Sequence, residues 1–345
     1  MKLLATGTQG YIGSIMMMAL KSQGHEVAGI DTGFYAEDCL YDAESVRTGF
    51  LRKDIRKISE ADVTGYDALL HLGELSNDPL GQINPDLTFE INHQGSVRLA
   101  RLCKRVGVPR FIYSSSCSVY GLGAGEFKDE QSPVNPQTAY AECKVRVERE
   151  VSAMADDRFS PTFLRNATVY GLSPRFRFDL VLNNLAGTAQ TMGEIKMSSD
   201  GSPWRPLVHV RDVCQAFLCA LHAPREVVHN QVFNVGATAE NFRVREIAEI
   251  VAGAFPGCGI RVGGGDRDSR SYRVSFDKIA ARLPGFRCAM SARDGARELR
   301  ELFERIGLDR ARFEDRAFTR LKQIRHLLET QQLDEHLFWR HEPPG

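Results

Sequence analysis

The sequence lacks the features that mark several specialised classes of protein. It has no run of about 18 apolar residues, so it predicts no membrane-spanning helix. Its 44 basic and 44 acidic side chains cancel, so bulk charge gives no reason to expect nucleic acid or an anionic membrane as a partner. The eight cysteines form no CxxC pair and the nine histidines form no HExxH signature, so no metal site is expected.

The N-terminus begins with a strand-like run, without a basic region, a long apolar stretch and a cleavage site of small residues. A signal peptide is therefore not expected, and the sequence predicts a cytoplasmic protein with reduced cysteines. Because the net charge is zero, any anionic ligand has to be held by a local arrangement of donors.

Short β-branched runs alternate with longer helical patterns over the first two thirds of the chain. This alternation predicts an α/β fold with a doubly wound parallel sheet over residues 1–165, joined by a returning strand near 231–235. A smaller C-terminal α/β portion is expected over 166–307. A helical extension is expected over 308–345, as one amphipathic helix packed on the body or, alternatively, as a surface for a partner. The predicted strands of the first unit are 2–6, 26–30, 68–72, 110–115 and 162–165, and its helices are 11–23, 85–107 and 138–155.

A glycine-rich turn, Gly7-Thr8-Gln9-Gly10-Tyr11-Ile12-Gly13, follows the first predicted strand and opens the first helix. Glycine allows a tight turn and the close approach of a pyrophosphate, which the free N–H groups at the helix start then bind. The second predicted strand is followed by Asp31. A carboxylate there accepts the ribose hydroxyls of adenosine and repels a 2′-phosphate, so the pattern favours NAD over NADP.

Tyr140 and Lys144 are four residues apart on a predicted helix, so they share one face. A lysine in this position stabilises the phenolate of the tyrosine. A free tyrosine has a pKa of about 10, so work near neutrality needs a shift of about 3 units, or roughly 4 kcal/mol. Lys144 and a positive nicotinamide ring together are able to supply that shift.

A run of serines, Tyr113-Ser-Ser-Ser-Cys-Ser-Val-Tyr120-Gly121, stands at the carboxyl end of a predicted central strand. Open parallel sheets bind their ligands at this end. Serine hydroxyls placed there are able to hydrogen-bond both a sugar hydroxyl and the tyrosine.

With these three motifs the chain resembles the extended short-chain dehydrogenase/reductase superfamily and, within it, the NAD-dependent sugar-nucleotide epimerase/dehydratase family. The resemblance covers roughly residues 1–305. It implies that residues 1–165 are a Rossmann-type NAD-binding domain and that 166–307 bind the substrate. It also implies a catalytic trio of Ser116, Tyr140 and Lys144.

Further matches to the family extend the expected sites. The cofactor residues implied by the motifs are Gly7, Gly10, Tyr11, Ile12, Gly13, Asp31, Asp54, Ile55, Leu72, Gly73, Ser114, Tyr140, Lys144 and Asn166. The residues expected to hold a nucleotide-diphosphate sugar are Ser76, Ser116, Asn183, Asn184, Arg205, Arg267 and Arg270.

Departures from the family pattern narrow the expected reaction. Ser118 stands where dehydratases and decarboxylases of the family usually have an acid. Cys117 lies one residue before the position of the cysteine in GDP-fucose synthase-like enzymes, so its side chain is expected on the other face of an extended strand end. Glu74 replaces one of the usual small residues, and Ser76 stands where UDP-galactose 4-epimerases often have a lysine.

The resemblance therefore implies an NAD-dependent epimerase, an isomerase that acts at C4 of a nucleotide sugar. Tyr140 is expected to take the proton of the C4 hydroxyl as hydride passes to NAD, and a transient 4-keto sugar then rotates and accepts the hydride on its other face. Two alternatives remain open. One is an NAD(P)H-dependent 4-ketoreductase, or another oxidoreductase or dehydratase of a deoxysugar pathway. The other is a non-catalytic NAD-binding scaffold.

The resemblance also implies a partner. Family members pair two helices across a two-fold axis, and the corresponding helices here are 85–107 and 138–155. A homodimer through these helices is therefore expected.

Overall fold

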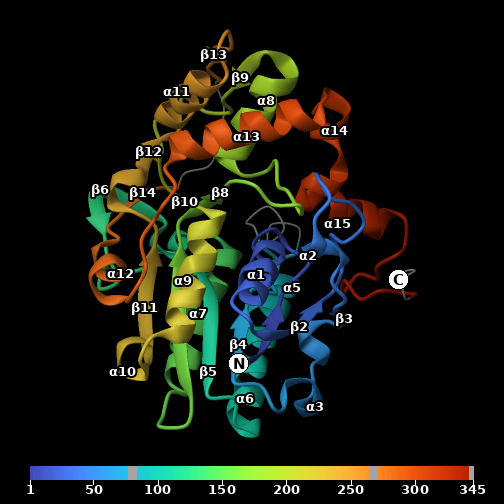
Figure 1. Ribbon diagram of the computed structural model, residues 1–345, viewed down its shortest axis with the longest axis vertical. Coiled ribbons are helices and arrows are strands. Elements are labelled where there is room, and N and C mark those ends of the chain that lie inside the picture. Colours follow the sequence, from blue (N-terminus) through green and yellow to red (C-terminus); the bar gives the residue numbers. More distant parts are fainter. Residues whose placement is uncertain (77–83, 264–269, 342–345) are drawn as a thin grey trace.

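Seven parallel strands form the central sheet of the protein (Figure 1). The computed structural model describes residues 1–76, 84–263 and 270–341. The sheet order is β11-β7-β5-β4-β1-β2-β3, which confirms the expected α/β fold with a doubly wound parallel sheet. The strands are β1 (Lys2–Thr6), β2 (Glu26–Asp31), β3 (Leu51–Arg52), β4 (Ala68–His71), β5 (Arg110–Ser116), β7 (Ser160–Asn166) and β11 (Gln231–Val235).

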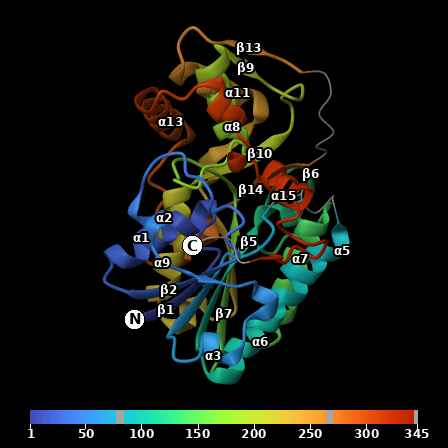
Figure 2. The ribbon, with the colours of Figure 1, turned by 90° about the vertical axis from the view of Figure 1, so that its right-hand side faces the viewer.

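Helices cover both faces of this sheet (Figure 2). Because both faces are covered, the central strands β4 and β7 are buried along their whole length. One face carries α1 (Tyr11–Ser22) and α9 (Val210–His222), and the other carries α3 (Glu60–Val63), α6 (Ser96–Val106) and α7 (Ala139–Ser152). Shorter helices elsewhere are α2 (Glu44–Arg47), α10 (Arg225–Val228) and α12 (Asp277–Arg282).

The predicted helix 85–107 is interrupted. The chain forms α5 (Pro85–Thr88), then a π-helical turn over Phe89–Gly95, then α6. The turn brings Asn92 inward, where its side chain accepts from the Leu75 N–H at 2.8 Å and donates to the Leu75 carbonyl at 2.9 Å. The interruption therefore fixes the chain that leaves β4, a common placement for a π-bulge near a functional site.

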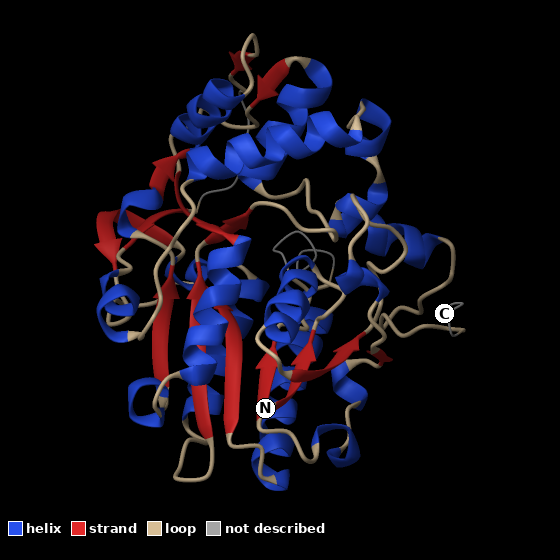
Figure 3. Cartoon of the chain, viewed as in Figure 1, coloured by secondary structure: helices blue, strands red, loops and turns tan. Residues whose placement is uncertain are grey.

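A second group of elements lies over the carboxyl ends of the central strands (Figure 3). It contains a three-stranded sheet of order β12-β10-β8 and two strand pairs, β13-β9 and β14-β6. Its strands are β6 (Leu122–Lys128), β8 (Thr168–Tyr170), β9 (Glu194–Lys196), β10 (Trp204–His209), β12 (Asn241–Arg243), β13 (Gly259–Arg261) and β14 (Ser271–Val274), and its helices are α8 (Val181–Met192), α11 (Val244–Ala254) and α13 (Ala292–Ile306).

The C-terminal extension has two helices where the sequence pattern predicts one. These are α14 (Arg310–Glu314) and α15 (Arg320–Glu329). The break comes at Asp315, whose side chain accepts from the Ala317 N–H at 2.8 Å and caps a separate short turn. The segment after α15 lies beside β2 and β3 (Figure 1), where Trp339 donates to the Thr32 carbonyl at 2.7 Å.

The two helices expected at a dimer interface bury most of their apolar side chains inside the protein. Leu99 and Leu102 of α6 and Val147 and Val151 of α7 are buried against the sheet. The homodimer stays a prediction, and measuring the mass in solution by light scattering tests it.

None of the described helices is long and apolar enough to cross a membrane. All eight cysteines are free thiols.

Candidate active site

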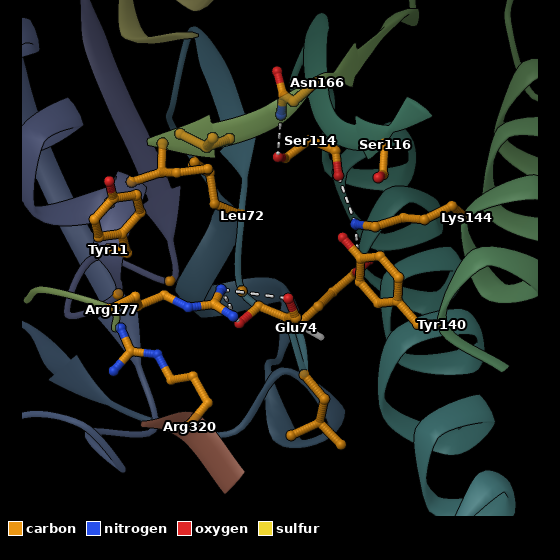
Figure 4. Close-up of a pocket in the computed structure, with 18 of the residues that line it drawn as sticks. Tyr11, Leu72, Glu74, Ser114, Ser116, Tyr140, Lys144, Asn166, Arg177 and Arg320 are labelled. Carbon is orange, nitrogen blue, oxygen red and sulfur yellow. Dashed lines mark hydrogen bonds and ion pairs between the residues drawn. The ribbon is translucent and has the colours of Figure 1, made fainter. Parts of the chain in front are cut away.

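A cavity of about 790 Å³ opens where the carboxyl ends of the central strands face the second group of elements. Its size falls within the range of roughly 300–1,000 Å³ that is usual for small-molecule sites. It is lined from the ends of β1, β2, β4 and β5, from the start of α7, and from residues after β7. Figure 4 shows how its side chains converge from these elements.

The glycine turn forms one wall of the cavity. Gly7 has a φ of +74°, and a Cβ on it would lie 2.7 Å from the Leu72 carbonyl carbon. A Cβ on Gly13 would lie 1.9 Å from the Gly7 oxygen. Gly10 precedes α1 and makes no side-chain cap, so the first N–H groups of the helix are left for a ligand. Tyr11 also lines the wall, and its hydroxyl donates to the Gly171 carbonyl at 2.6 Å.

Asp31 lies beside this wall at the end of β2. Its two oxygens accept from the Gln9 N–H at 2.9 Å and the Gly33 N–H at 2.7 Å. Burial raises the pKa of Asp31, and these two backbone donors oppose the rise. The carboxylate is thus held in one orientation toward the cavity. Asp54 and Ile55 line the same end.

Tyr140 and Lys144 project from the first turns of α7 into the opposite end (Figure 4). The Thr138 side chain accepts from the Ala141 N–H and caps this helix. The Lys144 Nζ lies 5.3 Å from the centre of the Tyr140 ring and donates to the Ser114 carbonyl at 2.6 Å. Ser116 ends β5 on the same side of the cavity. The structure therefore brings the three predicted catalytic residues to one place.

Glu74 is a site residue whose role the sequence did not reveal. Its carboxylate is almost fully buried and accepts from the Lys144 Nζ at 2.5 Å, the Tyr113 hydroxyl at 2.7 Å and the Ser96 hydroxyl at 2.9 Å. Burial lowers the pKa of Lys144, but Glu74 outweighs that effect and holds it above its ordinary value. In the sequence Glu74 is only an acidic residue at a position where the family usually has a small one, and it lies 70 residues from Lys144.

Two arginines that the sequence pattern did not single out also line the cavity. Arg177 comes from the loop before α8 and Arg320 from the first turn of α15. Arg177 forms a two-point ion pair with Asp179, with both N–O distances at 2.9 Å, and donates to the Ser76 hydroxyl at 3.2 Å. The C-terminal extension thus contributes a side chain to the site.

The structure places only some of the residues predicted to bind the substrate at the cavity. Ser76, Ser116, Arg205 and Arg270 line the cavity. Asn183 is fully buried and bonds the Gly171 N–H, the Tyr11 hydroxyl and the Arg177 carbonyl, and Asn184 donates to the Phe178 carbonyl. Neither asparagine lines the described cavity, so their contact with substrate stays a prediction. Arg267 lies outside the described residues.

Cys117 points away from the cavity. Its Sγ lies 3.1 Å from the Arg165 carbonyl oxygen, and burial raises its pKa well above the ordinary value. The neighbouring Ser116 and Ser118 both line the cavity. A thiol in this position does not reach a ligand, so the geometry gives no support to a cysteine that transfers protons at the sugar ring.

Comparison with known proteins identifies the family. The model of the NAD dependent epimerase/dehydratase family matches residues 3–236. The chain belongs to this family. A UDP-glucose 4-epimerase from Mycolicibacterium smegmatis is 31% identical over 271 residues, covering 74% of this chain and 82% of the relative.

Solved structures of NAD-binding enzymes of nucleotide sugars share the fold of this chain. TunA, an NAD-dependent NDP-hexosamine 5,6-dehydratase, superposes with a TM-score of 0.78 at 23% identity, over 88% of this chain and 98% of its own. MoeE5 in complex with UDP-glucose and NAD superposes with a TM-score of 0.72 at 25% identity, over 88% of this chain and 99% of its own. NAD is the cofactor of the family.

The cavity fits NAD at both ends. All the predicted cofactor residues line it, and the Gly7–Gly13 turn leaves no room for side chains where a pyrophosphate has to approach. Asn166 Oδ1 and Ser118 Oγ are buried with no hydrogen-bond partner in the described part of the chain. Buried polar atoms normally have partners, so these two acceptors mark places where a polar ligand group fits.

Replacing Gly13 with alanine is expected to disrupt this wall. The new methyl group would meet the Gly7 carbonyl at 1.9 Å, and backbone in the turn cannot move without displacing the phosphate-binding N–H groups. We expect NAD affinity to fall at least tenfold, as measured by titration calorimetry, and the melting temperature to drop. The matched control is Gly253→Ala, an exposed helical position with no atom within 4 Å, which is expected to leave both unchanged or to stabilise by about 1 kcal/mol. Equal NAD affinity for Gly13→Ala and wild type would contradict the assignment.

Proposed function

We propose that this protein is an NAD-dependent nucleotide-sugar epimerase that acts at C4, with UDP-sugars as the first candidates. The observation that carries the proposal is the convergence of Tyr140, Lys144 and Ser116 on one cavity, where the described lining residues include hydroxyls at 116 and 118 and no thiol. The relative from M. smegmatis that is named a UDP-glucose 4-epimerase supports the choice of substrate.

In this proposal the residues of the chain handle protons and orientation. Tyr140 Oη accepts the proton of the C4 hydroxyl and later returns it. The Lys144 ammonium, held by the Ser114 carbonyl and Glu74, favours the phenolate of Tyr140. Ser116 hydrogen-bonds the same hydroxyl. When bound, NAD supplies a reversible acceptor for the C4 hydride.

The sugar nucleotide is held by residues of the second group of elements. Arg205 on β10 and Arg270 before β14 line the cavity together, and an Arg205 guanidinium N–H donates to the Arg270 carbonyl. Guanidinium groups suit the paired oxygens of a diphosphate. With the diphosphate fixed there, the sugar is able to rotate while its nucleotide stays in place.

Incubation with nucleotide sugars and no added reductant tests the proposal. UDP-glucose and UDP-galactose, then dTDP-, GDP- and CDP-hexoses, are followed by proton NMR of the anomeric signals. Interconversion of C4 epimers is expected, and a deuterium label at C4 should stay on the sugar because the same hydride returns. Loss of water indicates a dehydratase, and no change in any sugar by the NAD-loaded protein favours a scaffold. In a separate incubation with a 4-keto nucleotide sugar and added NADPH, stoichiometric oxidation of NADPH indicates a ketoreductase. Each of those three results would contradict the proposal.

A further inference from the structure

The C-terminal extension inserts one guanidinium into the cavity. Arg320 begins α15, is only 2% exposed and lines the cavity. Its Cζ lies 4.0 Å from the centre of the Tyr35 ring, and its Nη2 lies 3.3 Å from the Arg175 carbonyl oxygen that accepts its hydrogen bond. A fully buried arginine usually has a carboxylate partner.

Arg320 has no such partner among the described residues. Within the described part of the chain it contacts a carbonyl oxygen and an aromatic ring, and the carboxylates of Asp31 and Asp179 interact with it only through longer-range electrostatics. Burial and the nearby Arg177 lower the pKa of Arg320 to about 10, so the side chain still carries its charge at pH 7. A buried charge without a partner is costly, which indicates that an anionic ligand completes the site.

The surroundings of Arg320 match a phosphate ligand. Arg177 lies next to it on the same side of the cavity, close to Tyr11 and across from Tyr140 and Lys144 (Figure 4). Asp179 balances Arg177, so the charge of Arg320 stays unbalanced. The Tyr35 hydroxyl on the same wall is buried with no hydrogen-bond partner among the described residues. A buried cation and a residue with an unsatisfied buried hydroxyl thus line the same part of the cavity.

We propose that Arg320, supported by Arg177, binds the diphosphate of the bound dinucleotide, and that the C-terminal extension is therefore part of the cofactor site. Two diphosphates are available in principle, that of the cofactor and that of the sugar nucleotide. The cofactor's is favoured because Arg320 lies beside Tyr35 and acts on Asp31, the carboxylate at the end of β2. The inference rests on NAD binding and not on epimerisation at C4.

The extension is held where this role requires it. Arg312 forms an ion pair with Asp38, and Arg316 forms one with Glu37 at 2.6 Å. Both acids belong to the segment that follows Asp31, to which Trp339 is also bonded through the Thr32 carbonyl. The extension is therefore tied to the segment that leaves β2, so its arginine stays close to the adenosine end of the cavity.

The test measures ligand binding to protein stripped of nucleotide, by titration calorimetry. Arg320→Gln is expected to lower the affinity for NAD and ADP at least tenfold. The affinity for adenosine, which has no phosphate, is expected to change less than twofold. Arg320→Lys keeps the charge but loses the two-point geometry, so an intermediate loss is expected. UDP binding should not change in either variant. The matched control is Arg325→Gln, an exposed position on the same helix, which should leave all four ligands unaffected.

Stability separates ligand binding from a structural role. Without nucleotide, Arg320→Met removes a buried unpaired charge while keeping apolar contact, so its melting temperature should equal or exceed that of wild type. NAD should then raise the melting temperature less than it does in wild type. The proposal would be overturned by a lower melting temperature of Arg320→Met than of wild type without nucleotide. It would also be overturned if Arg320→Gln lost ADP and adenosine affinity equally, lost affinity for UDP alone, or bound ADP as wild type does. None of these measurements depends on turnover, so their failure is distinct from a failure of the proposed epimerase activity.

Discussion

Replacing Tyr140 with phenylalanine is expected to lower kcat by about a thousandfold, which corresponds to roughly 4 kcal/mol of transition-state stabilisation. The variant loses only the hydroxyl oxygen that takes the substrate proton. The ring is retained over the Lys144 ammonium, 5.3 Å from its centre, and the hydrogen bond from Lys144 to Ser114 does not involve the lost atom. NAD binding is therefore expected to change by less than a factor of two.

The measurement is single-turnover conversion of a nucleotide sugar by NAD-loaded protein, with NAD affinity measured separately. Tyr66→Phe is the matched control, since Tyr66 lies outside the cavity and packs against Lys2, and it should keep full activity. Lys144→Met should lose both turnover and NAD affinity, whereas Tyr140→Phe should lose turnover with NAD affinity nearly unchanged. A Tyr140→Phe variant that keeps more than a tenth of wild-type kcat would show that another group is the base.

Residues close together in the sequence were predictable because one local rule places them. The glycine turn follows from the need for a strand to turn tightly into a helix, and the structure puts Gly7, Gly10 and Gly13 on one cavity wall. Tyr140 and Lys144 are one helical turn apart, so helical geometry alone places both on one face. The buried strands were equally predictable from the sequence, because a parallel sheet covered on both faces needs continuous apolar runs.

The remaining part of the site depends on contacts that no local pattern encodes. Arg320 meets the Arg175 carbonyl across 145 residues of sequence, and Arg177 meets Ser76 across 101. Asn183 shows the converse difficulty, because an asparagine at the start of a helix has the same appearance in the sequence whether it faces a ligand or the interior. Here its amide is used to hold the Tyr11 hydroxyl and the Arg177 carbonyl.

Glu74→Gln is expected to move the acidic limb of the kcat against pH profile to lower pH by roughly one to two units. The Glu74 carboxylate lies 2.5 Å from the Lys144 Nζ and offsets part of the positive charge that favours the Tyr140 phenolate. When the carboxylate is replaced by a neutral amide of similar shape, the full charge of Lys144 acts on Tyr140. The pKa of the base therefore falls, and activity persists at lower pH.

Other titratable groups near this pair do not mask the effect. Burial lowers the pKa of His71 to about 4, so His71 is neutral over the working range. Burial raises the pKa of Tyr113 well above its ordinary value and that of Cys143 to about 12, so both stay protonated. Arg177 is charged throughout and is paired with Asp179. The shift between the two profiles is therefore assigned to the Glu74 charge.

Stability provides the second readout of the same substitution. In Glu74→Gln the Lys144 ammonium is buried without a carboxylate, which is expected to cost about 3 kcal/mol at neutral pH. Its folded-state pKa then falls below the unfolded value of about 10.4, so stability should recover as the pH rises toward 10. In wild type the folded pKa of Lys144 is raised instead, so its contribution is fully present below the unfolded pKa and is lost only as the pH rises through the raised folded value.

The double variant Glu74→Gln with Lys144→Met tests the stability change, and the acidic limb of the single variant Glu74→Gln decides between a positioning role and a merely structural one for Glu74. The double variant removes both charges, so much of the lost stability should return without any return of activity. If Glu74→Gln is destabilised but its acidic limb coincides with that of wild type, Glu74 serves only to hold the fold. If the limb moves to lower pH, the buried acid between Lys144 and Tyr113 sets the pH at which Tyr140 becomes a base, because no other group in contact with Lys144 loses charge in the substitution.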